Sequence, residues 1–182
     1  MASVGDAVVL GAEAVITYLF VGHNDPALET AAFHDNASVN AAARTAGIVH
    51  IVETMGARAA RASDVHDGDF VRFHVRIGMV MGADIIKTDW PGSVAALKRI
   101  VDETPLPVML AGGPNNGSDR GTLELVADVM GAGASGILFG RSIFQAREPL
   151  AVMRACRAII HDRLSVDAAI DGAGFQRRPD AA

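Results

Sequence analysis

The amino-acid sequence predicts an α/β protein built on a parallel β-sheet, and three observations predict it. Short apolar segments alternate with longer amphipathic segments along the chain, which is the order of right-handed βαβ units. The apolar segments are almost continuous in hydrophobic residues, as is typical of parallel strands covered on both faces. Four of them follow a corner that contains glycine, a residue that commonly ends the preceding helix.

Five apolar segments are expected to form the strands. They are residues 14–21, 48–53, 83–89, 107–111 and 136–140. Apolar residues at spacings of three and four predict helices between and after them. These helices are expected from residue 25 toward residue 47 and over residues 69–81, 91–104, 118–132 and 149–161. Residues 172–182 have no periodicity and are expected to form a mobile tail, which leaves residues 1–171 as one domain.

The composition indicates one folded domain and excludes several classes of protein. Of the 182 residues 50% are hydrophobic, so the chain can bury a substantial core. The net charge of −5 argues against a nucleic-acid-binding surface, which needs clustered positive charge. Cys156 is the one cysteine, which excludes an internal disulfide and suits a reducing compartment, so a cytoplasmic location is expected. The apolar residues 8–21 contain Glu13 and lack a basic leader, which argues against a signal peptide or a membrane span.

Five parallel strands can form an open, doubly wound sheet or part of a (β/α)8 barrel. In both architectures the ligand binds at the carboxyl ends of the strands. The candidates for chemistry are therefore the polar residues and glycines at the points where the predicted strands end.

Lys87 is the first of these candidates. It lies near the end of an apolar strand, in a chain whose 16 basic residues include only one other lysine, Lys98. An ammonium group is costly to bury, so such a lysine is either paired or deprotonated, and a deprotonated lysine can form a Schiff base with a carbonyl substrate. The alternative is a structural lysine that extends toward solvent and pairs with Asp89 or Asp84. Side-chain alternation places Asp89 on the face of Lys87, as a partner or proton relay, and Asp84 on the other face, where it caps the start of the strand.

Two glycine-containing loops are candidates for phosphate binding. Gly112 and Gly113 follow the fourth predicted strand, where glycine lets the backbone approach a ligand closely. Gly140 and Arg141 follow the fifth, and a guanidinium group beside backbone N–H groups suits a phosphate. Each loop alone also fits an ordinary strand-to-helix turn. Two of them on successive strands are more specific, because barrels often hold phosphate between the loops after their last two strands.

Few residues are candidates for acid–base catalysis. Glu53 closes the second predicted strand, and its carboxylate faces either the site or a salt bridge with Arg58 or Arg61. Tyr18, the one tyrosine of the chain, lies within the first predicted strand and is expected to pack in the core with its hydroxyl bonded. His50 is likewise expected to be a core residue. The six histidines show no metal-ligand spacing, so no metal site is expected.

Three segments carry a family resemblance. They are Gly-Ala-Asp-Ile-Ile-Lys-Thr-Asp-Trp-Pro-Gly over residues 82–92, Pro-Val-Met-Leu-Ala-Gly-Gly over residues 107–113 and Gly-Ala-Ser-Gly-Ile-Leu-Phe-Gly-Arg-Ser-Ile-Phe-Gln over residues 133–145. In order and spacing they closely resemble the archaeal-type class I fructose-bisphosphate aldolase family, whose barrel is related to that of deoxyribose-phosphate aldolase. The resemblance is strong over residues 69–161 and weaker over residues 3–58.

The resemblance implies a reaction and the residues that perform it. Lys87 matches the lysine that forms the Schiff base in the family. The residues that match the phosphate site of the family are Gly112, Gly113, Gly140 and Arg141. The implied reaction is reversible aldol cleavage of a phosphorylated ketose such as fructose 1,6-bisphosphate, without a metal or another cofactor. A homo-oligomer is expected, with a phosphorylated sugar as the substrate and no nucleic-acid or membrane partner.

The chain departs from the family pattern in three places. Trp90 occupies a position where the family has an aromatic residue that is often tyrosine. The proton-transferring tyrosine of the family is missing from residues 52–57, so Glu53 or a water is expected to replace it, and the catalytic set becomes Lys87, Glu53 and Asp89. Family members also have about three further strands before the point where this chain starts, and these supply an aspartate. The expected fold is therefore an incomplete (β/α)8 barrel with five β/α units, strands four to eight.

Two other functions stay open at this point. A thiolase-like member of the same family acts on a phosphorylated dione, and residues 85–88, Ile-Ile-Lys-Thr, are shared with it. The other is a truncated, non-catalytic paralogue that binds sugar phosphates, for which the missing strands and the missing tyrosine argue.

Overall fold

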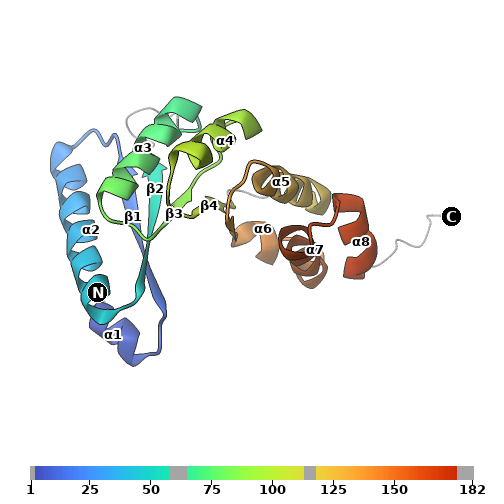
Figure 1. Cartoon of the computed structure of the whole chain (residues 1–182), viewed down its shortest axis with the longest axis horizontal. Helices are drawn as coiled ribbons and strands as arrows, with labels where there is room; N and C mark the ends of the chain where they lie inside the picture. The colour runs from blue at the N-terminus through green and yellow to red at the C-terminus, as the bar shows by residue number, and fades with distance from the viewer. Residues whose placement is uncertain (1–2, 58–64, 113–117, 176–182) are drawn as a thin grey trace.

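The computed structural model describes residues 3–57, 65–112 and 118–175, and its strands and helices alternate in the predicted order. Within these residues five strands form one parallel sheet in the order β1-β2-β3-β4-β5 (Figure 1). The strands are β1 (Ala14–Val21), β2 (Val49–Gly56), β3 (Ile85–Thr88), β4 (Val108–Ala111) and β5 (Gly136–Leu138). All five predicted strands are confirmed, and β2 continues beyond its predicted end to Gly56.

The helices lie between and after these strands. They are α1 (Val4–Val9), α2 (Pro26–Ala46), α3 (Gly68–Val80), α4 (Val94–Glu103), α5 (Asp119–Gly131), α6 (Arg141–Phe144), α7 (Pro149–Asp162) and α8 (Val166–Ala173). The predicted helices correspond to α2, α3, α4, α5 and α7. The sequence pattern did not predict α1, α6 and α8 as helices. The last of them includes residues 172 and 173, which the sequence analysis assigned to the tail.

Polar side chains cap the N-termini of the helices that connect the strands. Asp25, Asp67, Ser93 and Ser118 accept hydrogen bonds from backbone N–H groups in the first turns of α2, α3, α4 and α5. Each of these helices follows the carboxyl end of a strand, so the caps hold the loops that surround this edge of the sheet. Gly47 ends α2 in the left-handed conformation, with φ +71°, which glycine adopts without steric cost.

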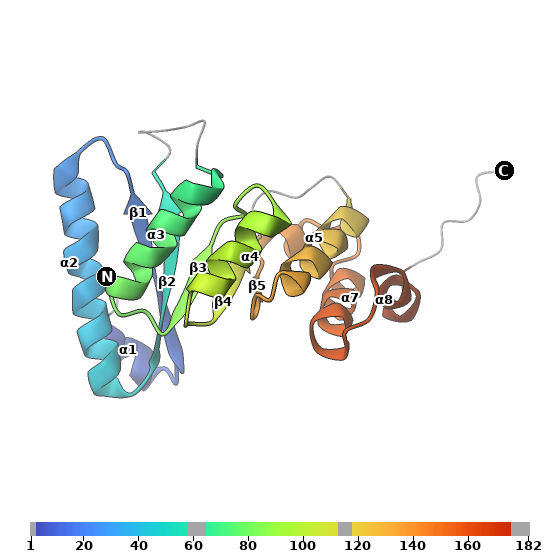
Figure 2. The ribbon, with the colours of Figure 1, turned by 45° about the horizontal axis from the view of Figure 1, so that its top comes forward.

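The strand order determines where the helices lie. Successive parallel neighbours joined by right-handed crossovers place their connecting helices on one face of the sheet. A doubly wound sheet reverses its strand order and carries helices on both faces. Figure 2 shows α2, α3, α4 and α5 in succession along one face. The doubly wound alternative is therefore wrong, and the sequential order is the one found in barrels.

The other face of the sheet is open in the described parts of the chain. On β1, Leu19 and Val21 are buried on the helix side, whereas Ile16, Tyr18 and Phe20 on the opposite side are 44%, 56% and 44% exposed. The prediction that both faces are covered is wrong for these residues. Apolar side chains on both sides of a strand indicate a strand suited to burial, but they do not identify the element that covers each side.

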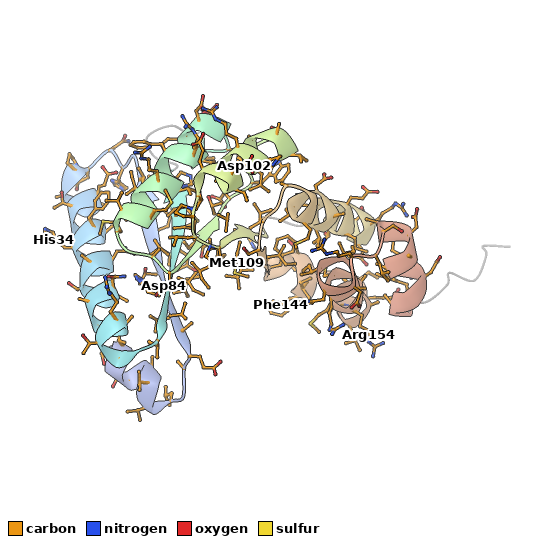
Figure 3. The ribbon with its side chains drawn as sticks, viewed as in Figure 1. His34, Asp84, Asp102, Met109, Phe144 and Arg154 are labelled. Atoms are coloured by element: carbon orange, nitrogen blue, oxygen red, sulfur yellow. The ribbon has the colours of Figure 1, made fainter. Side chains whose placement is uncertain are left out.

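Buried polar side chains join α2, β1 and β2 on the helix side of the sheet. Oγ1 of Thr17 lies 2.6 Å from Oδ1 of Asn36 and 2.8 Å from Nε2 of His50. The backbone N–H of His50 donates to Oδ2 of Asp84 at 2.8 Å. Asp84, which is labelled in Figure 3, directly precedes β3. The prediction that His50 is a core residue is confirmed. Asp84 lies directly before its strand, but its carboxylate binds the backbone of β2. These bonds hold the three elements in register below the candidate site.

Candidate active site

Lys87 and Glu53 form an ion pair on the open face of the sheet. Nζ of Lys87 donates to Oε2 of Glu53 at 2.7 Å, and the two side chains are 15% and 7% exposed. The residues are register partners on β3 and β2, so the spacing of the strands brings them together. Of the two orientations that the sequence left open for Glu53, the structure has the one that faces the site. Arg58 and Arg61 lie outside the described residues.

The pair balances two charges that are largely removed from water. Burying a lone carboxylate or ammonium is costly, and a close partner of opposite charge offsets that cost. The same contact places a carboxylate 2.7 Å from the amine of Lys87. An amine that attacks a carbonyl must lose a proton, and a base within hydrogen-bond distance is the group that can accept it. The contact therefore stabilises the fold and also places a base beside the amine.

A hollow of about 610 Å³ surrounds this pair at the carboxyl ends of the strands. Its lining includes the predicted residues Lys87, Glu53, Asp89, Gly112, Gly140 and Arg141. The rest of the lining consists of Tyr18, Phe20, Met55, Gly56, Val65, His66, Ala111 and Leu138. Six of the seven predicted site residues thus line one hollow, and the seventh, Gly113, lies outside the described residues. Their catalytic and phosphate-binding roles stay predictions.

A hydrogen bond joins the two glycine-containing loops. Oγ of Ser142, on α6, donates to the backbone carbonyl of Gly112 at 2.8 Å. A Cβ on Gly112 would lie 3.0 Å from the ring of Phe139 and 3.0 Å from Oγ of Ser142, so glycine is needed for this close approach. The loop after β4 and the loop after β5 therefore form one edge of the hollow, where Arg141 is exposed.

Tyr18 is the site residue that sequence reasoning missed. It was expected to pack in the core, but it lies on the open face and lines the hollow, 56% exposed. Its register partner is Glu53, so Tyr18, Glu53 and Lys87 lie in one row across three strands. Each of Tyr18 and Glu53 is the fifth residue of its strand. The sequence did not carry this signal by itself, because the second strand was predicted to start at residue 48 and the register of the two strands is not visible in the sequence.

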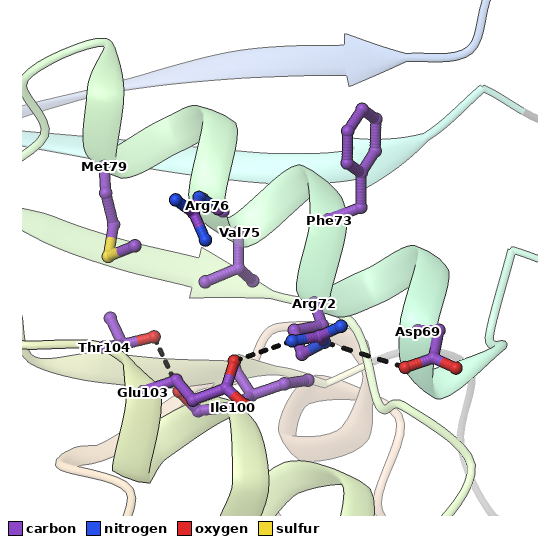
Figure 4. Close-up of a pocket in the computed structure, with 9 residues that line it drawn as sticks. All are labelled: Asp69, Arg72, Phe73, Val75, Arg76, Met79, Ile100, Glu103 and Thr104. Atoms are coloured by element: carbon purple, nitrogen blue, oxygen red, sulfur yellow. Dashed lines mark hydrogen bonds and ion pairs between the residues drawn. The ribbon is translucent and has the colours of Figure 1, made fainter.

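A second hollow lies away from the strand ends, between α3 and α4. It has a volume of about 630 Å³, and Figure 4 shows the nine residues that line it. Arg72 donates to Glu103 at 2.9 Å and lies 3.6 Å from Asp69, so its charge is already balanced. This hollow is on the outer side of the helix layer and contains none of the residues at the carboxyl ends of the strands. It is therefore separate from the candidate active site.

Cys156, the one cysteine of the chain, lies away from the candidate site. Cys156 is buried in the cluster formed with α5, α7 and α8, and burial raises the pKa of its thiol to about 11. Its burial among apolar side chains indicates a structural thiol. Among the described residues, no group of three His, Cys, Asp or Glu side chains could hold a metal ion. No helix in the described part of the chain is long and apolar enough to cross a membrane.

Comparison with known proteins identifies the family. A model of the family described as DeoC/LacD family aldolase matches residues 1–146. The chain belongs to this family. It is 38% identical over 173 residues to 2-amino-3,7-dideoxy-D-threo-hept-6-ulosonate synthase of Halobacterium salinarum, a match that covers 95% of the chain and 63% of the synthase.

Solved structures agree with the family and with the fold. The crystal structure of an archaeal fructose 1,6-bisphosphate aldolase superimposes with a TM-score of 0.82 at 28% identity, over 88% of the chain and 63% of the aldolase. A structure of an archaeal fructose-1,6-bisphosphate aldolase whose catalytic lysine is covalently bound to the carbinolamine intermediate gives a TM-score of 0.81 at 28% identity, over 87% and 62% of the two chains. This member of the DeoC/LacD family therefore spans about three fifths of the length of these relatives.

Proposed function

We propose that this DeoC/LacD family chain forms or cleaves a carbon–carbon bond in a phosphorylated ketose, such as fructose 1,6-bisphosphate, through a Schiff base on Lys87. The observation that carries the proposal is the 2.7 Å contact between Lys87 and the buried Glu53, inside a hollow at the carboxyl ends of the strands. A lysine of this kind combines a nucleophilic amine with a neighbouring base and partial exclusion of water. The archaeal aldolase with a carbinolamine on its catalytic lysine supports the same chemistry.

The reaction uses Lys87 as the nucleophile. Its ammonium group passes a proton to Glu53, and the free amine adds to the ketone carbon to give a carbinolamine. The hydroxyl group of the carbinolamine then takes a proton and leaves as water, which gives a protonated imine, whose nitrogen lies beside Glu53. When the carbon–carbon bond breaks, its electron pair moves toward this nitrogen, which leaves an enamine on Lys87 and releases an aldehyde. The reverse sequence joins the enamine to an aldehyde.

The loops after β4 and β5 are proposed to hold the substrate phosphate. Gly112 lets the backbone approach a ligand, and Arg141 supplies a guanidinium group at the exposed edge of the hollow. Gly113 and Gly140 complete the predicted set. A phosphate bound here would place the ketone near Lys87, so that binding energy supports the chemistry. Asp89, on the same face as Lys87, is proposed as a proton relay.

The fold is proposed to be five consecutive units, strands four to eight, of a (β/α)8 barrel. The sequential strand order, the helices on one face and the exposed apolar residues of β1 on the other support this assignment. In a barrel these residues would face the interior. At the other end of the sheet, Phe144, Leu150 and Met153 on α6 and α7 are also exposed. They would be covered by the units that complete the barrel.

A second candidate function follows from the synthase relative. That relative matches over 173 residues and is named for the synthesis of a hept-6-ulosonate, a seven-carbon product. The Schiff-base chemistry on Lys87 would be of the same kind, and the carbonyl compounds that it joins would differ. Product analysis with several phosphorylated ketoses and aldehyde acceptors distinguishes the two functions. A phosphorylated dione offered with coenzyme A tests the thiolase-like alternative in the same assay.

The test of the Schiff base is reductive trapping with sodium borohydride. Incubation of the 182-residue chain with fructose 1,6-bisphosphate or dihydroxyacetone phosphate is expected to leave a reduced adduct on the peptide that contains Lys87. The chain offers a matched control, because its one other lysine, Lys98, is exposed and pairs with Asp102. Lys87→Met should abolish the adduct and Lys98→Met should leave it unchanged. An absence of adduct on the unmodified chain, or an adduct on Lys98, would overturn the proposal and favour a non-catalytic binding role.

A further inference from the structure

Tyr18 presents its hydroxyl to the hollow that contains Lys87. It lies on the open face of β1 and stacks on Phe20, with ring centroids 6.1 Å apart and planes 17° apart. The stack orients a ring that is 56% exposed. Within the described residues no hydrogen bond is made by its hydroxyl group. A polar group that is held in place but has no protein partner is available to a ligand.

The distance between Tyr18 and Lys87 suits a small substrate. The two residues lie on β1 and β3, and Glu53 lies between them on β2 in the same row. Neighbouring strands are about 4.8 Å apart, so the backbones at Tyr18 and Lys87 are about 10 Å apart. A gap of this width leaves room between the two side chains for the carbon chain of a substrate that is bonded to Lys87.

The other acid–base groups near Lys87 are less suited to act on the substrate. Glu53 takes the proton of Lys87 when the amine becomes free, and it holds that proton until the amine is released again. His66 is exposed, and its Nδ1 lies 3.2 Å from the backbone carbonyl of Trp90. Arg141 stays charged throughout. Asp89, proposed above as a proton relay, also lines the hollow but already has an interaction of its own, whereas the hydroxyl of Tyr18 has no hydrogen bond among the residues that the structure describes.

We propose that Tyr18 is the catalytic acid and base that acts on the bound substrate, an inference that rests on the Schiff-base function proposed above. The phenol donates its proton to the hydroxyl group of the carbinolamine, which leaves as water while the carbon–nitrogen double bond forms. The phenolate then takes the proton from the substrate hydroxyl on the carbon beyond the breaking bond. The electron pair of that oxygen–hydrogen bond forms the aldehyde carbonyl, and the pair of the carbon–carbon bond forms the enamine.

The second half of the cycle restores both groups. The phenol protonates the enamine carbon, and the resulting phenolate takes a proton from the water that adds to the imine. Release of the ketone frees the amine of Lys87, which takes its proton back from Glu53. Protons given and taken by Tyr18 balance over the cycle, and no oxidant, metal or further reactant is needed.

The test measures the rate at which the borohydride-trapped adduct appears on the 182-residue chain. Tyr18→Phe keeps the ring and its stack and removes only the hydroxyl. It is expected to slow adduct formation about 100-fold, the lower end of the contribution of general acid–base catalysis, while the final amount of adduct is unchanged. Ile16→Ala is the control, because Ile16 lies on the same strand and face, is 44% exposed and does not line the hollow. This control is expected to react within about twofold of the parent.

The outcomes separate the two proposals. If the parent forms no adduct, the Schiff-base function fails and the role of Tyr18 fails with it. If the parent forms the adduct and Tyr18→Phe forms it equally fast, only the role of Tyr18 is overturned. An equal slowing by Ile16→Ala would also overturn it, because the effect would then come from packing on this face. Circular dichroism of each variant checks that the fold is retained.

Discussion

The two faces of the sheet differ in what their side chains do. On the helix side, Leu19 and Val21 of β1 are 0% and 3% exposed, and they pack with residues of α3 and β3. On the open side, Tyr18 and Phe20 of the same strand line a hollow with Lys87 and Glu53. One face therefore stabilises the sheet, and the other holds the groups that can react. Adjacent residues of a strand point to opposite faces, so neighbouring residues of β1 alternate between the core and the hollow.

The largest expected effect is a loss of stability when a buried side chain on the helix side of the sheet is shortened. The groups at the candidate site are not changed by such a substitution. Leu19→Ala should lower the free energy of unfolding by about 2–5 kcal/mol, because it removes a fully buried side chain and leaves a cavity. Ile16→Ala, on the open face, should lower it by less than about 1 kcal/mol. Urea denaturation followed by circular dichroism measures both. Equal losses for the two variants would show that something covers the open face in solution.

The buried histidine of α3 makes stability depend on pH. Burial lowers the pKa of His74 to about 4 from its ordinary value of 6.5, and its Nδ1 lies 3.0 Å from Oγ1 of Thr54. Because the folded state favours the neutral ring, this contribution is complete above pH 6.5 and is lost as the pH falls toward 4. The loss amounts to about 3 kcal/mol. Burial also lowers the pKa of His50, which acts in the same direction.

The measurement is the urea midpoint between pH 7.5 and pH 4.5. The parent midpoint should fall with pH, and the midpoint of His74→Gln should be lower at pH 7.5 but depend less on pH. An equally steep dependence in the variant would contradict the role of His74. The amount of trapped adduct on the folded protein at pH 7.5 should be the same for both, since His74 lies on the helix side.

The smallest expected changes in stability come from substitutions at two glycines, one at the candidate site and one in α5. Gly112→Ala places a Cβ 3.0 Å from Phe139 and Ser142, so the loops after β4 and β5 must shift. The variant should lose about 1 kcal/mol of stability and bind the phosphorylated ketose several-fold more weakly. Gly131→Ala, in α5, meets nothing within 4 Å and should gain about 0.5 kcal/mol. Denaturation and a binding titration measure the two, and unchanged ketose affinity in Gly112→Ala would argue against a phosphate site in this loop.

The elements and the location of the candidate site could be predicted from local patterns. Apolar segments, helix periodicity and caps such as Asp25 depend on residues close in the chain, so they are visible in the sequence. The short helices α1, α6 and α8 were missed, because a few residues give too little periodicity. The prediction that both faces of the sheet are covered was wrong, because an apolar strand sequence does not show which element covers each of its faces.

The sequence by itself determined the order of strands and helices, the position of Lys87 and of the glycine-containing loops at the strand ends, and the resemblance to the aldolase family. Only the tertiary structure decided that Lys87 pairs with Glu53, 34 residues away, and that Tyr18 joins them on the open face. The physical reason is register. Side-chain alternation along one strand is a local property, whereas the residue opposite it depends on hydrogen bonds to another strand and on the length of the helix between them.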